Sequence, residues 1–123
     1  MADQVKEFVD AVLVQLERIL SDLPNWGLTK EGEKMVRRAV HKFRWATITD
    51  AIVAQMYKID VLQALQDRLE NILALRETVL EHIQAARDVK WLGSWMEEAT
   101  GEPTFGVLQA INPSQSGKND LPN

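Results

Sequence analysis

The chain has 123 residues, of which 46% are hydrophobic, and it carries a formal net charge of −4 and no cysteine. This length fits one domain, and the hydrophobic content is typical of a folded protein and too high for a disordered one. The absence of cysteine excludes disulfides, thiolate zinc sites, iron–sulfur clusters and a cysteine nucleophile.

The N-terminal ten residues are polar and acidic, which is unlike a targeting segment. No uninterrupted apolar run exceeds four residues, far fewer than the roughly 20 that span a bilayer. We therefore expect a cytoplasmic protein that does not associate with membranes.

The first predicted element is a helix over residues 4–22. Apolar residues recur every three to four positions from Val5 to Leu23, the pattern of an amphipathic helix. Pro24 and Gly27 then end it. Trp26 lies in the connection that follows, and we expect it to pack across the corner between the first two helices.

Thr29 is the expected N-cap of a second helix, because its hydroxyl can accept a hydrogen bond from a free amide of the first turn. The apolar face of that helix is predicted to consist of Met35, Val36, Ala39, Val40 and Phe43. Residues 47–49 have modest helix propensity, so Thr47 or Thr49 is expected to cap a third helix. That third helix would run through Ile52, Met56 and Ile59.

A long helix is predicted over about residues 60–88, either separate from the third helix or continuous with it. Leucine, isoleucine and valine follow a three-to-four spacing there, with Arg76 occupying one position of the apolar seam. Such a helix would be roughly 40 Å long. It outgrows a compact domain of this size, so we expect it to pack against a second copy of the chain.

The last predicted helix contains Trp91 and Trp95, which lie on one face, and it ends at Gly101 and Pro103. These two tryptophans either cover the end of the bundle or form an exposed anchor for a partner. The predicted fold is therefore all-α: a four- to five-helix bundle domain over residues 1–100, with a long central helix, that forms a homodimer.

Residues 101–123 are predicted to form a flexible tail, rich in Gly, Pro, Ser and Asn. An apolar cluster interrupts it at 105–111, and its members are Phe105, Val107, Leu108 and Ile111. This cluster either folds back on the core or binds a partner as a short segment.

No motif for catalysis or for a cofactor is present. The two histidines, His41 and His82, fall in different predicted helices and form no pair with metal-ligand spacing. Neither a nucleophile elbow nor a glycine-rich phosphate loop occurs. We therefore expect no metal, no cofactor and no enzymatic activity.

Basic residues concentrate in the second predicted helix. The segment from Leu28 to Ala46 contains six Lys or Arg and two Glu, whereas the remainder of the chain has eight basic and sixteen acidic residues. The candidate binding residues are Lys30, Lys34, Arg37, Arg38, His41, Lys42, Arg44 and Trp45. They are expected to contact nucleic-acid phosphates, an acidic protein surface, or solvent alone.

The 31 residues at 28–58 resemble the helical segment of phage replication-organiser and DnaD-like proteins. The matching features are Lys42-Phe43 at the end of a charged amphipathic helix, and Ala51, Ile52 and Tyr57 in a second helix. The resemblance implies a small, non-catalytic accessory module in DNA replication of a phage or mobile element.

The leading hypothesis is a non-catalytic interaction protein that self-associates and binds a macromolecular partner, expected to be a protein. The alternative is a nucleic-acid-binding accessory protein, acting in replication or regulation, that uses the basic face of residues 30–44.

Overall fold

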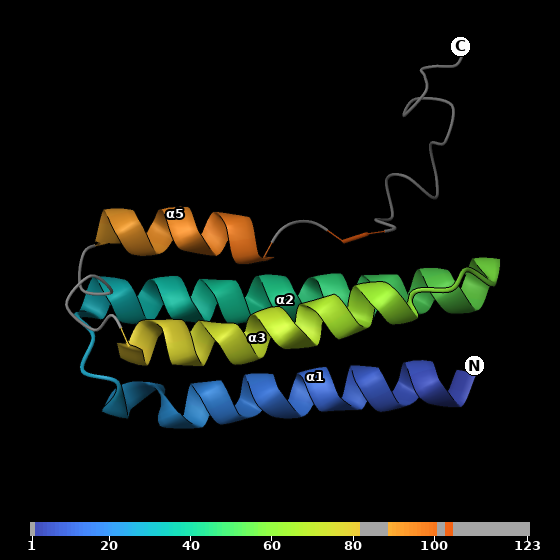
Figure 1. The fold of residues 1–123 in the computed structure, drawn as a ribbon, viewed down its shortest axis with the longest axis horizontal. Helices are drawn as coiled ribbons and strands as arrows, with labels where there is room; N and C mark the ends of the chain where they lie inside the picture. The colour runs from blue at the N-terminus through green and yellow to red at the C-terminus, as the bar shows by residue number, and fades with distance from the viewer. Residues whose placement is uncertain (1, 82–88, 101–102, 105–123) are drawn as a thin grey trace, which may run out of the picture.

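The computed structural model describes residues 2–81, 89–100 and 103–104. It confirms an all-α fold, with no strand among these residues. The helices are α1 (Ala2–Asp22), the short 3-10 helix η1 (Leu23–Asn25), α2 (Lys30–Tyr57), α3 (Leu62–Glu81) and α5 (Val89–Thr100). Successive helices run in opposite directions (Figure 1). The predicted tail cluster at 105–111 and residues 82–88 of the predicted long helix lie outside the described residues.

Helix α1 confirms the helix predicted over 4–22, and the corner that follows it is held by Trp26. This side chain is buried in the core cluster, and its Nε1 donates a hydrogen bond to Oδ2 of Asp22 at 2.9 Å. That hydrogen bond, aided by Arg76, lowers the pKa of the Asp22 carboxyl below its ordinary value. The predicted packing of Trp26 across the corner is thus confirmed.

Helix α2 begins as predicted, since Oγ1 of Thr29 accepts a hydrogen bond from the Gly32 amide at 3.1 Å. The predicted break at 47–49 is wrong, because α2 continues to Tyr57. The Thr47 hydroxyl donates to the Phe43 carbonyl at 2.7 Å, within the helix instead of capping a new one. Modest propensity costs only tenths of a kcal/mol per residue, and burial of the continuous inner face outweighs it. Lys58, in left-handed backbone at φ 57°, ends the helix.

Helix α3 lies within the helix predicted over 60–88, and it is separate from α2. Its amide at Leu62 donates to Oδ1 of Asp60 at 3.0 Å, which caps its first turn. The prediction that Arg76 occupies the apolar seam is wrong, because Arg76 is exposed and its Nη2 lies 3.6 Å from Oδ2 of Asp22. The buried face of α3 comprises Leu65, Arg68, Ile72, Leu75 and Val79.

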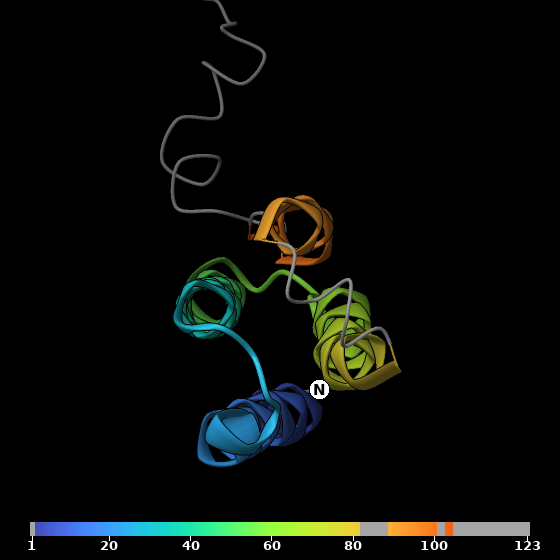
Figure 2. The same cartoon turned by 90° about the vertical axis from the view of Figure 1, so that its left-hand side faces the viewer.

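The four α-helices of the described residues surround one apolar core, with α2 and α3 side by side between α1 and α5 (Figure 2). Buried members of this core cluster come from every helix and include Leu16, Phe43, Leu75 and Leu92. Trp91 and Trp95 are half-buried and pack against the same cluster. They therefore cover the bundle instead of standing free.

Helix α5 has only 12 residues, whereas α2 has 28. It consequently covers the first part of α2 and ends beside its middle (Figure 1). Within the described parts of the chain, no helix is both long and apolar enough to cross a membrane.

Candidate interaction surface on helix α2

The outward face of α2 changes character along its length. Residues three or four positions apart lie on one face of a helix, and two such groups follow each other here. We define the cationic half of this face as Lys30, Lys34, Arg37, Arg38, His41 and Lys42. We define its apolar half as Trp45, Ile48, Ile52 and Met56. All ten side chains are exposed, and they lie opposite the buried face that contains Phe43 and Asp50.

The cationic half is mostly available to a partner. Arg37 approaches Glu33, one turn earlier, with 3.7 Å between Nη2 and Oε2. Arg44 turns away from this face towards α1, where its Nη2 donates to Oε1 of Glu17 at 2.9 Å. The side chains that form no ion pair with any described residue are Lys30, Lys34, Arg38, His41 and Lys42.

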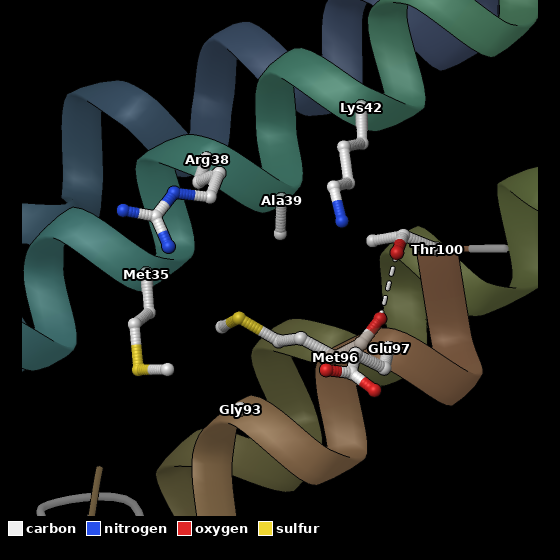
Figure 3. Close-up of a pocket in the computed structure, with 8 residues that line it drawn as sticks. All are labelled: Met35, Arg38, Ala39, Lys42, Gly93, Met96, Glu97 and Thr100. Atoms are coloured by element: carbon white, nitrogen blue, oxygen red, sulfur yellow. Dashed lines mark hydrogen bonds between the residues drawn. The ribbon is translucent and has the colours of Figure 1, made fainter. Parts of the chain in front are cut away.

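Two of these cations border a small cavity between α2 and α5 (Figure 3). Arg38 and Lys42 extend from α2, and Glu97 extends from α5 beside them. The cavity measures about 100 Å³, enough for a few waters. Because a carboxylate offsets the two cations, we regard it as the seam where α5 docks and not as a ligand site.

The apolar half exposes large side chains to an unusual extent. The exposed fractions are 57% for Trp45, 43% for Ile48, 50% for Ile52 and 65% for Met56. Single exposed apolar residues are ordinary on protein surfaces, but contiguous ones mark interaction sites. Elsewhere in the described chain, exposed large aliphatic residues such as Val14 and Leu73 belong to other helices. The apolar half is therefore the strongest candidate for an interface.

A buried ion pair lies beneath this part of α2. Nη2 of Arg68 is 2.8 Å from Oδ2 of Asp50, and the two side chains are 6% and 0% exposed. The backbone amide of Thr104 also donates to Oδ2 of Asp50 at 3.3 Å. Nη1 of Arg68 is buried and has no hydrogen-bond partner. Such a pair contributes little net stability, since desolvation offsets its Coulomb attraction.

The described residues contain no group of three or more His, Asp or Glu side chains that could hold a metal ion. No protein-family model matches the chain, and neither the curated proteins nor the solved structures contain a significant match.

The sequence pattern singled out the residues of the cationic half and Trp45 as candidates for binding. It assigned Ile52 and Met56 to a separate helix. The structure places both on the outward face of α2. The signal that would have found them is the spacing itself. Counted as one helix from Lys30, Ile52 and Met56 fall on the same face as Lys34 and Trp45.

Proposed function

We propose that the protein is a non-catalytic helical interaction protein. It self-associates through the apolar half of α2 and holds an acidic macromolecular partner with the adjacent cationic half. The observation that supports this proposal is the row of four large apolar side chains, each 43% exposed or more, along one helix face. Covering these side chains would remove apolar surface from water, which favours association at about 25 cal/mol per Å².

The occupant we propose for the apolar half is the same face of a second copy. In a two-fold dimer the same patch serves both subunits, so each row of Trp45, Ile48, Ile52 and Met56 would cover the other. An antiparallel arrangement is favoured on electrostatic grounds. It separates the two cationic halves, whereas a parallel arrangement would set like charges side by side.

The mass of the full chain in solution, measured by light scattering and sedimentation across a concentration series, tests self-association. Ile52→Glu is expected to weaken the dimer at least 100-fold, because it places a charge in the centre of the patch. Leu73→Glu is the matched control, since Leu73 is 46% exposed on α3. The proposal fails if the unmodified chain is still a monomer at about 100 µM, taken as an order-of-magnitude upper limit for a functional dimer. It also fails if the two variants weaken the dimer equally.

The cationic half also supports a second candidate function, nucleic-acid binding in an accessory role. The supporting observation is that Lys34, Arg38, His41 and Lys42 are exposed along one helix face, next to Trp45. Cations in a row can follow phosphates, and an exposed aromatic ring can stack on a base. The resemblance of residues 28–58 to replication-organiser proteins would place such an activity in DNA replication of a phage or mobile element.

Fluorescence anisotropy with single- and double-stranded oligonucleotides at two salt concentrations separates the two functions. Binding through phosphates should weaken steeply with salt and on replacing Arg37 and Arg38 with Glu. Arg18→Glu on α1 is the control, because Arg18 is also exposed. If no binding occurs at low salt, the second candidate function is wrong and an acidic protein remains the expected partner.

A further inference from the structure

Helix α2 extends beyond the end of α5, and its inner side stays buried there. Ala39, Ala46 and Val53 are seven residues apart, so they lie along one side of the helix. Ala39 lines the cavity beneath α5. Thr100, the last residue of α5, lines that cavity together with Lys42. Val53 is three turns further along α2, yet it is only 3% exposed. No described helix covers this side of α2 beyond α5 (Figure 1).

The neighbouring side of α3 shows the same feature. Asn71 lies beside the last turn of α5, because its Nδ2 donates to the Ala99 carbonyl at 3.1 Å. Helix α3 runs antiparallel to α2, so its earlier residues lie progressively beyond α5. Leu65 of α3 and Val61, which directly precedes α3, are fully buried there. Like Val53, they are buried without belonging to the core cluster beneath α5.

Thr104 fixes where the following chain begins. Its amide donates to Asp50 in α2, and the residue lines a cavity of about 190 Å³ together with Arg68. The next seven residues carry four apolar side chains, Phe105, Val107, Leu108 and Ile111. Seven residues span about 10 Å as a helix and about 23 Å when extended. The rest of α2, from Asp50 to Tyr57, also measures about 10 Å.

We propose that residues 105–111 lie over α2 and α3 beyond α5, with their apolar side chains against Val53, Val61 and Leu65. This segment is a better occupant than a second copy, because the residue before it, Thr104, is already bonded to Asp50 of α2. Tethering gives a local concentration of the order of millimolar. The proposed self-association uses other residues of α2, the exposed Trp45, Ile48, Ile52 and Met56, whereas this proposal uses the buried Val53.

Two truncations of the full chain test this cover. A chain that ends after Ile111 retains the segment and should keep the thermal midpoint of the full chain. A chain that ends after Thr104 should melt about 10 °C lower, the shift expected on uncovering two or three buried side chains in a domain of this size. It should also bind an apolar fluorescent dye. Equal midpoints for the two truncations would overturn the proposal.

A double-mutant cycle covers the case in which the shorter chain does not fold. Leu108→Ala and Val53→Ala should each lower the midpoint, and together by clearly less than the sum, because contacting residues are coupled. Leu121→Ala is the control and should not couple to Val53→Ala. These melts are repeated in a chain that also carries Ile52→Glu, which should not self-associate. In that chain the thermal midpoint should be the same at every protein concentration. Additive effects, or a midpoint that changes with protein concentration, would show that the segment is not the cover.

Discussion

The two halves of α2 have opposite distributions of polarity. In residues 30–44, beneath α5, the inner face is apolar, with Val36, Val40 and Phe43 fully buried, and the outer face is cationic. In residues 45–57 the inner face carries the buried Asp50, paired with Arg68. The outer face there is apolar.

The two halves of α2 therefore differ in what they contribute, one to the stability of the fold and the other to binding. The first half follows the usual arrangement, in which apolar burial drives folding and charges stay in water. The second half buries an ion pair, which contributes little net stability, and leaves about half of several large apolar side chains in water. We infer that the first half stabilises the fold and that the second half is suited to further contacts, with residues 105–111 and with a second copy.

The largest effect is expected at the buried ion pair. Asp50→Asn should cost about 3–5 kcal/mol of unfolding free energy, because it leaves the Arg68 guanidinium buried without its counter-charge. The double variant Asp50→Leu with Arg68→Met should lie much closer to the unmodified chain. Urea unfolding measures both. A loss below 1 kcal/mol for Asp50→Asn would show that water reaches the Arg68 guanidinium in the folded protein.

A smaller gain is expected where α5 docks on the first half. Gly93→Ala adds a Cβ 2.7 Å from Cε of Met35, the mobile end of a flexible side chain that can move aside. Alanine is better than glycine inside a helix by about 1 kcal/mol, so the variant should be stabilised by up to that amount. Met35→Leu alone serves as the control for packing. Destabilisation by Gly93→Ala would mean that the Met35 side chain cannot move aside where α5 packs on α2.

The exposed carboxyl of Asp22 provides a contrast with the buried Asp50. Its pKa is lowered in the folded state, chiefly by the hydrogen bond from Trp26. A lowered folded pKa contributes stability above the unfolded value of about 4, and this stability is lost as pH falls through the folded pKa. Asp22→Asn should therefore be less stable than the unmodified chain at pH 7. The difference in stability should shrink as pH falls through the folded pKa of Asp22, as measured by thermal melts across pH. A difference independent of pH would contradict this.

The smallest effect on the folded subunit is expected in the apolar half. Ile48→Lys should change the unfolding free energy of the monomer by less than about 0.5 kcal/mol, as is usual for exposed sites. The measurement is made at protein concentrations below those at which the chain associates, because association adds apparent stability. A loss above 1 kcal/mol would mean that this side chain packs within its own subunit.

The sequence predicted the helices better than their faces. The apolar spacing predicted α1, and Thr29 predicted the start of α2, because both signals are local in the sequence. The continuation of α2 through Thr47 was not predictable from propensity, since the hydroxyl bonds back to Phe43 only once the flanking turns are helical. Arg76 and Leu75 were exchanged in the predicted seam, because a one-residue step rotates a side chain by about 100°.

The candidate interface was only half predictable. The cations from Lys30 to Lys42 are visible as a composition bias, and their exposure follows from the cost of burying charge. The exposure of Ile52 carries no such local signal, because an isoleucine at helical spacing is more often buried. The burial of Arg68 is likewise invisible until Asp50 is known to lie opposite.

The sequence by itself determined that the chain is helical, where its first helix ends and its second begins, and that one stretch is basic. The tertiary structure alone decided which sides of α2 and α3 are covered. The physical reason is that burial depends on neighbours. The neighbouring helices cover the inner side of α2 and leave its outward face uncovered, so Trp45, Ile48, Ile52 and Met56 stay in water while Asp50 pairs with Arg68 of α3 inside. No residue of α2 specifies this combination alone.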